Sequence, residues 1–181
     1  MWKGIALVNQ SALLSLNDLK GGRVLTELSV GDQLQIHELI AKYSFAWDGA
    51  DVEGFAALFT DAAVCRFYLN GAETPDTEIS GRQALRQAVI DRAEFFKEIG
   101  MLTMHFMPNS VITPVGPNAA QVRTQAMISW QMKGVDLAPR PVQAGYYQSE
   151  VVRTSDGWKF AARDVLLNGV FKVKAVYGPV K

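Results

Sequence analysis

The second half of the chain is predicted to consist almost entirely of β-strands, and this feature constrains the fold most. The predicted strands cover residues 101–107, 110–115, 119–133, 142–154 and 157–168. Gly116-Pro-Asn118 and Ser155-Asp-Gly157 supply turn signals between them. Strands that follow one another across short turns pair antiparallel, so this half of the chain predicts an antiparallel sheet.

Three helices are predicted ahead of these strands. The first extends from Asp32, a residue type that caps helices, to Asp48, because apolar side chains recur at spacings of four, three and four. These side chains are Ile36, Ile40, Tyr43 and Trp47. A second helix is predicted from Asp51, then a strand at residues 64–69 and a third helix at residues 80–100. Short helices followed by long antiparallel strands predict an α+β fold in which a strongly curved sheet wraps the helices.

The length and hydrophobic content of the chain fit one domain. A chain of 181 residues with 49% hydrophobic residues can close one sizeable core. We expect the domain at residues 32–169, with an N-terminal arm at residues 1–31 and a C-terminal tail at residues 170–181. The short apolar run at the N-terminus is broken by Asn9 and Gln10, and no small-residue cleavage site follows, so we expect a cytoplasmic protein.

Charge and cysteine content argue against several classes of function. The 18 basic and 18 acidic residues cancel, and no Lys/Arg cluster is interleaved with aromatic residues, so we expect no binding to nucleic acid or to an anionic membrane. No apolar stretch approaches the ~20 residues of a membrane-spanning helix. The single cysteine, Cys65, excludes an internal disulfide and is interpreted as a core residue. His37 and His105 lie on different elements without metal-ligand spacing, and no phosphate-binding loop occurs, so we expect neither a metal nor a cofactor.

Two polar residues in apolar surroundings point to a catalytic site. Asp48 ends the first predicted helix, and His105 lies in the apolar run at residues 101–107. A carboxylate that meets an imidazole in a dry cavity fixes its tautomer and stabilises the imidazolium formed on proton capture. The two residues are therefore predicted to form a general base. Asp48 also fits a helix cap, and His105 also fits a core histidine with its hydrogen bonds satisfied. Both interpretations stay open.

Several aromatic residues are candidates for the wall of an apolar pocket. Tyr43 points inward from the first helix, where its hydroxyl either binds a substrate oxygen or is satisfied in the core. A hydrophobic small-molecule substrate is expected to contact Phe67, Phe106, Trp130 and Tyr147, which also fit plain core packing. His37, on the neighbouring stripe of the first helix, is expected at the surface.

Four segments in the same order resemble the SnoaL-like, nuclear-transport-factor-2-like superfamily. They are residues 36–64, Gly81-Arg-Gln-Ala-Leu85, Met104-His-Phe-Met-Pro-Asn109, and the closing Gly145-Tyr-Tyr147 with Asp156-Gly-Trp-Lys-Phe160. The resemblance implies a cystatin-like α+β barrel, in which a cone-shaped antiparallel sheet and three helices enclose an apolar cavity. This superfamily hosts isomerases, dehydratases, cyclases, epoxide hydrolases and binding modules, so the fold does not determine the function.

The resemblance is greatest to the dehydratase and dehydrochlorinase branch of the superfamily. Asp48 and His105 stand where hexachlorocyclohexane dehydrochlorinase and bile-acid 7α-dehydratase carry their Asp and His, and scytalone dehydratase has a comparable His. In these enzymes the His is the base of an elimination. Tyr43 resembles the tyrosine that holds a carbonyl or hydroxyl oxygen, and the segment that ends at Asn109 implies that this residue also contacts the substrate.

Other positions depart from the family pattern. Ketosteroid isomerase carries its base carboxylate on the first strand, where this chain has Phe67. The arginine that supports the leaving group in the elimination enzymes has two candidate counterparts, Arg153 and Arg163, and Arg163 also fits a solvated strand edge.

Three functions from different classes follow from these observations. The first is a cofactor-free lyase or isomerase that uses His-Asp general base catalysis on a hydrophobic small molecule, by dehydratase-like elimination or polyketide-cyclase-like chemistry. The second is a small structural subunit of an aromatic-ring dioxygenase, and the third is a non-catalytic binding module. We also expect the outer sheet face at residues 121–132 and 145–152 to be rich in Val, Tyr and Trp, which predicts a homodimer or homotrimer.

Overall fold

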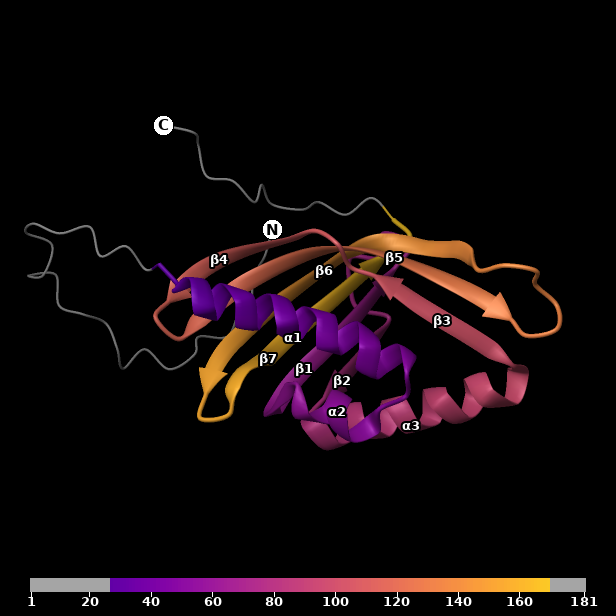
Figure 1. Cartoon of the computed structure of the whole chain (residues 1–181), viewed down its shortest axis with the longest axis horizontal. Coiled ribbons are helices and arrows are strands. Elements are labelled where there is room, and N and C mark those ends of the chain that lie inside the picture. The colour runs from indigo at the N-terminus through magenta and orange to yellow at the C-terminus, as the bar shows by residue number, and fades with distance from the viewer. Residues whose placement is uncertain (1–26, 170–181) are drawn as a thin grey trace, which may run out of the picture.

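The computed structural model describes residues 27–169. Apart from residues 27–31, the predicted N-terminal arm and the C-terminal tail lie outside this range. The helices and strands follow the order α1 (Val30–Asp48), α2 (Val52–Ala57), β1 (Phe59–Leu69), β2 (Thr77–Ser80), α3 (Arg82–Ile99), β3 (Met101–Phe106), β4 (Ser110–Gly116), β5 (Ala119–Met132), β6 (Arg140–Thr154) and β7 (Gly157–Leu167). The predicted α+β fold is confirmed (Figure 1).

The strand β1 begins earlier than predicted. Phe59, which was expected to continue the second helix, already pairs with Phe160 of β7, and both side chains are fully buried. Tertiary pairing thus overrides the helical pattern at this point. The short strand β2 was not predicted; it lies between the strand predicted at residues 64–69 and the helix predicted from residue 80, and it pairs antiparallel with β1.

Local capping explains where the first two helices begin. Ser29, rather than the predicted Asp32, is the N-cap of α1, because its hydroxyl oxygen accepts the Asp32 backbone N–H at 3.1 Å. Asp51 caps α2 as predicted, and its carboxylate accepts the Gly54 backbone N–H at 2.9 Å. Gly100 ends α3 in the left-handed conformation at φ 67°, so the chain reverses directly into β3. This tight connection places His105 next to the helices.

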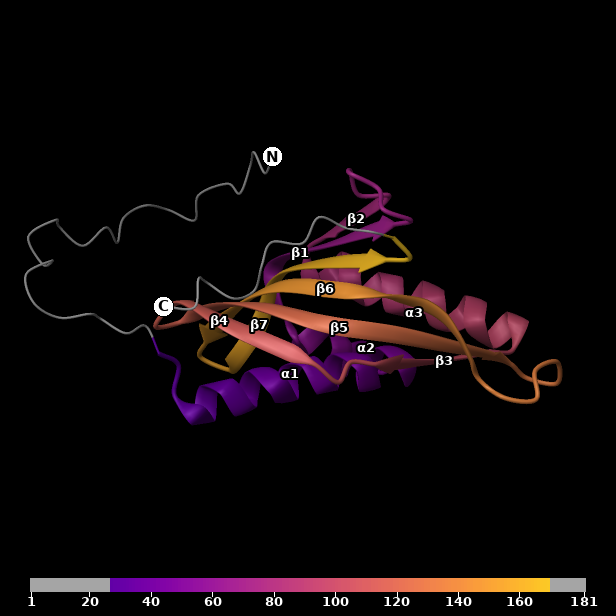
Figure 2. The same ribbon diagram turned by 90° about the horizontal axis from the view of Figure 1, so that it is seen from above.

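The sheet has the strand order β2-β1-β7-β6-β5-β3, and β4 also pairs with β5. All neighbouring strands are antiparallel except β1 and β7, which are parallel. Register shifts interrupt the β5–β6 and β6–β7 pairings, and such bulges increase the twist and curvature of a sheet. The strands run across the three helices, which lie together on one side of the sheet (Figures 1 and 2).

The core lies between the helices and the inner face of this curved sheet. The predicted stripe of α1 is confirmed, because Ile36, Ile40 and Tyr43 are all buried. Tyr43 lies at the centre of a group of aromatic rings whose centroids are 5.2 to 6.4 Å from its own. These rings belong to Trp47, Phe55, Phe59, Tyr147 and Phe160.

The outer face of β5 and β6 differs from the expectation. Val122 and Val151 are buried on the inner face, as is Tyr147. The alternating positions that face outward on β5 are Gln121, Arg123, Gln125 and Met127, three of which are polar. The expectation of an outer face rich in Val, Tyr and Trp is therefore wrong for β5, because the apolar residues of this strand point inward and its polar residues point outward.

None of the helices within residues 27–169 is long and apolar enough to cross a membrane.

Candidate active site

Asp48 and His105 form a close pair. The Nδ1 atom of His105 lies 2.6 Å from Oδ1 of Asp48, and the His105 backbone N–H donates to Oδ2 at 2.7 Å. The side chains are 6% exposed for His105 and 18% exposed for Asp48. The predicted hydrogen-bond distance between the two residues is confirmed. Because one carboxylate binds both the backbone and the ring of His105, it fixes the orientation of the imidazole.

The second ring nitrogen of His105 is available for proton transfer. With Nδ1 directed at the carboxylate, Nε2 is the nitrogen left to meet a ligand. Within the described range, Nε2 makes no hydrogen bond. An imidazole held in this way can accept a proton at Nε2, while the carboxylate stabilises the imidazolium that results.

Asp48 is suited to stabilise that charge. Burial alone would raise the pKa of Asp48, but the hydrogen bonds and the charge of His105, together with the hydrogen bond from Thr103, hold this pKa below its ordinary value. The hydroxyl of Thr103 donates to Oδ1 at 2.9 Å. Asp48 is therefore ionised at neutral pH. Thr103 was not predicted as a site residue, although its position two residues before His105 puts it on the same face of β3.

Arg163 is a buried cation on the inner face of β7. Its side chain is 0% exposed, and its Nη1 atom donates to the Ser149 hydroxyl at 2.9 Å. The Nε–H group has no hydrogen-bond partner within the described residues. Among residues 27–169 no carboxylate forms an ion pair with Arg163. A buried charge without a counter-ion is costly, which indicates a role other than stability.

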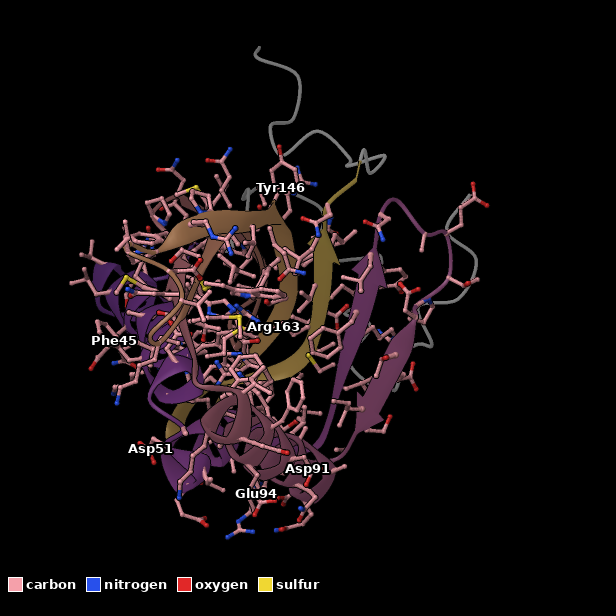
Figure 3. All side chains as sticks on the ribbon, turned by 90° about the vertical axis from the view of Figure 1, so that its right-hand side faces the viewer. Phe45, Asp51, Asp91, Glu94, Tyr146 and Arg163 are labelled. Carbon is pink, nitrogen blue, oxygen red and sulfur yellow. The ribbon has the colours of Figure 1, made fainter. Side chains whose placement is uncertain are left out.

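Aromatic rings surround the guanidinium of Arg163. Its central carbon lies 3.9 Å from the ring centroid of Tyr43, 4.6 Å from that of Tyr147 and 4.5 Å from that of Phe160. Figure 3 shows Arg163 inside the curve of the sheet and Tyr146 outside it. Of the two candidate arginines, only Arg163 lies in this interior. Arg153 instead forms an ion pair with Asp32 near the start of α1.

The acid–base pair and the arginine influence the same tyrosine. Burial raises the pKa of Tyr147 well above its ordinary value, and the charge of Asp48 adds to this shift whereas that of Arg163 opposes it. Burial likewise raises the pKa of Tyr43, against the opposing charge of Arg163. Met107, which follows β3, has its sulfur atom 4.0 Å from Nη2 of Arg163. The interior therefore combines a histidine base, a guanidinium and two neutral phenols.

The other predicted contact residues separate into two groups. Tyr147 is buried, and Phe67 and Trp130 pack partly buried against the core. Phe106 and Asn109 do not lie in this interior, and their contact with a substrate stays a prediction. Phe106 alternates with His105 along β3, faces outward and is 44% exposed. The exposed Asn109 donates its side-chain amide to Gln125 on the outer face.

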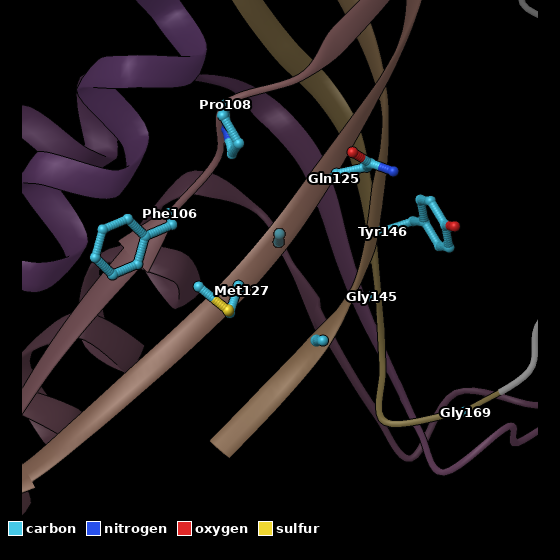
Figure 4. A pocket seen from close by; sticks show the side chains of 9 residues that line it. Phe106, Pro108, Gln125, Met127, Gly145, Tyr146 and Gly169 are labelled. Atoms are coloured by element: carbon cyan, nitrogen blue, oxygen red, sulfur yellow. The ribbon is translucent and has the colours of Figure 1, made fainter. Parts of the chain in front are cut away.

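Phe106 lines a shallow hollow on the outer face of the sheet (Figure 4). The hollow has a volume of about 450 Å³, and Pro108, Met127, Tyr146 and Gly169 contribute to its wall. A neighbouring hollow of about 550 Å³ includes His37 and Asn109. His37 is exposed, as predicted. No group of three or more His, Cys, Asp or Glu side chains in the described part of the chain is arranged to hold a metal ion.

Solved structures share this fold. ActVI-ORFA from Streptomyces coelicolor matches with a TM-score of 0.66 and 17% identity, covering 79% of this chain and 99% of that one. A candidate scytalone dehydratase from Novosphingobium aromaticivorans matches with a TM-score of 0.58 and 24% identity, over 76% and 83% of the chains. The β subunit of a candidate aromatic-ring-hydroxylating dioxygenase from the same organism matches with a TM-score of 0.62 and 15% identity, over 84% and 100%. Other matching structures are described as having a cystatin-like fold, as predicted.

No curated protein matches the chain. The family model of the SnoaL-like domain matches residues 29–164, which include all of α1 and most of β7. This match spans both the Asp48–His105 pair and Arg163, and the chain belongs to the SnoaL-like domain family.

Proposed function

We propose that the protein is a cofactor-free lyase or isomerase in which His105 is the general base. The observation that carries this proposal is the 2.6 Å contact between Asp48 and His105, with Nε2 of His105 left unbound among the described residues. A core histidine with a purely structural role would be expected to satisfy both ring nitrogens. The buried Arg163 adds a second polar group, which has no partner of opposite charge within residues 27–169.

The proposed reaction starts with the transfer of a proton from carbon to Nε2 of His105. This carbon lies next to a carbonyl or similar activating group, and Asp48 stabilises the imidazolium. In an elimination, the electrons of the C–H bond form a double bond as the leaving group departs with its electron pair. In an isomerisation, the imidazolium returns the proton to a different carbon.

Arg163 and Tyr43 are proposed to bind the oxygen on which negative charge develops. A guanidinium and a phenol in a buried site stabilise an oxyanion better than water does, because they are already oriented and the surroundings are apolar. The neighbouring rings of Tyr147 and Phe160 suit a hydrophobic substrate.

Deuterium exchange tests the proton transfer whatever product the reaction yields. Hydrophobic ketones and β-hydroxyketones are incubated with the protein in D₂O, and NMR follows deuterium uptake beside the carbonyl. We expect exchange with the wild type and none above background with H105A. The matched control is H37A, because His37 is the other histidine and is exposed. Equal exchange by H105A and the wild type would overturn the assignment of the base.

A second candidate is the small subunit of an aromatic-ring dioxygenase. The specific observation is the structural match that covers all of a dioxygenase β subunit and 84% of this chain. Such a subunit would copurify with a large iron–sulfur subunit, and D48N would leave the assembly intact. A non-catalytic binding module would instead bind a hydrophobic ligand equally well in the wild type and in H105A.

A further inference from the structure

The end of α1 concentrates negative charge at the candidate active site. Asp48 is the last residue of this helix, whose C-terminal carbonyl groups already carry a partial negative charge. The last turn of α1 contains no basic residue to balance it. A carboxylate in this position is unfavourable unless a cation from another element compensates.

Arg92 of α3 supplies that cation. Its side chain is 11% exposed, and its Nη1 atom donates to the backbone carbonyl of Trp47 at 2.6 Å. Its Nη2 atom lies 3.9 Å from Oδ1 of Asp48 and also donates to the hydroxyl of Thr103. Thr103 in turn donates to the same Oδ1 atom at 2.9 Å. Arg92, Thr103, Asp48 and His105 therefore form one continuous chain of hydrogen bonds.

Two aromatic rings hold the guanidinium of Arg92 in place. Its central carbon lies 4.9 Å from the ring centroid of Trp47 and 4.4 Å from that of Phe96. Burial lowers the pKa of Arg92, and the charge of Asp48 opposes this shift. Because a guanidinium stays protonated in proteins, a fixed positive charge stands beside the carboxylate at neutral pH.

We propose that Arg92 is a positioning residue for the Asp48–His105 pair, which it orients through Thr103 and whose imidazolium form its fixed charge disfavours. This inference rests on the proposed function, because only a general base has to be free of its proton before substrate arrives. A buried carboxylate by itself favours the imidazolium, whereas a nearby cation opposes it. Arg92 thus offsets part of the effect of Asp48.

The charged and titratable groups around this pair come from several elements. They are Asp48 and Tyr43 on α1, Arg92 on α3, His105 on β3, Tyr147 on β6 and Arg163 on β7 with Cys65 beside it on β1. Burial raises the pKa of each of Tyr43, Tyr147 and Cys65, so these groups stay neutral up to high pH.

A histidine NMR titration tests the proposal without substrate. The chain contains two histidines, and the exposed His37 serves as an internal control. We expect R92Q to raise the pH at which His105 takes up its proton by about one pH unit, with His37 unchanged. R92K keeps the charge and is expected to restore most of the wild-type midpoint. An unchanged or lowered His105 midpoint in R92Q would overturn the proposal, since it would mean that Arg92 only supports the fold.

Two further variants keep the test decisive. R86Q is the matched control, because Arg86 lies on the same helix but pairs with the exposed Glu53, and this variant is expected to leave both titrations unchanged. T103V removes the hydroxyl that donates to Asp48 and is expected to raise the His105 midpoint by less than R92Q does. If R92Q does not fold, T103V decides the question. An unchanged His105 midpoint in T103V would then overturn the proposal. The NMR titration uses no substrate, so its result can be interpreted even if no activity is found for the protein.

Discussion

The guanidinium of Arg163 stacks on the ring of Tyr43 at 3.9 Å, and no carboxylate within residues 27–169 pairs with it. In most proteins a fully buried arginine is balanced by an acid, because an unpaired buried charge destabilises the fold. Here the guanidinium instead donates to the neutral hydroxyl of Ser149. The rings of Tyr43, Tyr147 and Phe160 offset part of the unfavourable free energy of burying this charge, but none of them neutralises it.

We predict that R163M separates stability from function. Methionine fills similar space without a charge, so the free energy of unfolding should equal or exceed that of the wild type. Substrate turnover, or ligand affinity if the protein is a binding module, should fall by at least ~10²-fold. Urea denaturation and the activity assay provide the two measurements. A loss of about 3 kcal/mol in stability would show instead that Arg163 is needed to hold the core together.

The two members of the acid–base pair should differ in kinetic importance. H105A removes the base and is predicted to lower kcat by ~10² to 10⁴-fold. D48N keeps the base but loses the charge that stabilises the imidazolium, so a small measurable rate should remain. Steady-state kinetics on any substrate found by deuterium exchange gives the comparison. Equal and modest losses in both variants would contradict these roles.

The thiol of Cys65 should be inert in the folded protein. Its side chain is 1% exposed, and burial raises the pKa of the thiol to about 12. A thiol reagent such as Ellman's reagent is predicted to react only after denaturation, with one equivalent per chain. Rapid reaction of the native protein at pH 8 would show that the interior opens to solvent.

Asp32 should make stability dependent on acid pH. Hydrogen bonds from Ser29, Trp158 and Arg153 lower the pKa of Asp32 to about 2, from 3.8. The folded state therefore favours the carboxylate, and this contribution is complete above about pH 5 and is lost as the pH falls through 3.8 toward 2. Thermal melting at pH 5 and pH 2.5 should show a smaller drop for D32N than for the wild type. Parallel losses in both proteins would refute the assignment.

An oligomer is still expected, but through a different surface. Leu102, Met104 and Phe106 face outward from β3, an end strand of the sheet, and are 58%, 53% and 44% exposed. Light scattering at micromolar concentration is predicted to give two or three times the 19.9 kDa chain mass. M104K should shift the assembly toward monomer, whereas L34K, on α1, should not. A wild-type monomer would refute the prediction.

Much of the fold could be predicted from the sequence because turn residues mark the strand ends. The predicted boundaries of the last five strands agree with the structure within two residues at each end. The parallel pairing of β1 with β7 could not be predicted, since no local pattern connects strands so far apart. The meeting of Asp48 with His105 was predictable from their apolar context and from the family resemblance. The role of Arg92 was not predictable, because its partners lie on other elements.

The position of Arg163 shows why simple alternation fails near a bulge. Trp158 and Phe160 face inward on β7, and continued alternation would point Arg163 toward solvent. The pairing with β6 skips Ala161, because Val151 is opposite Phe160 and Glu150 is opposite Ala162. This irregularity reverses the alternation of inward and outward side chains along β7, so Arg163 points inward. A single extra residue in one strand thus places the cation in the candidate site.

The position of β7 between β1 and β6 means that the sheet around the candidate site is complete only after β7 has been synthesised. Asp48 and His105 are 57 positions apart, whereas Arg66 of β1 meets Asp164 of β7 across 98 positions. A nascent chain that has emerged through β3 already contains both members of the acid–base pair, whereas β7, which carries Arg163, follows later in the chain. The arginine proposed to bind oxygen arrives on this final strand. An incomplete chain can therefore hold the base but lacks the group that stabilises the developing charge.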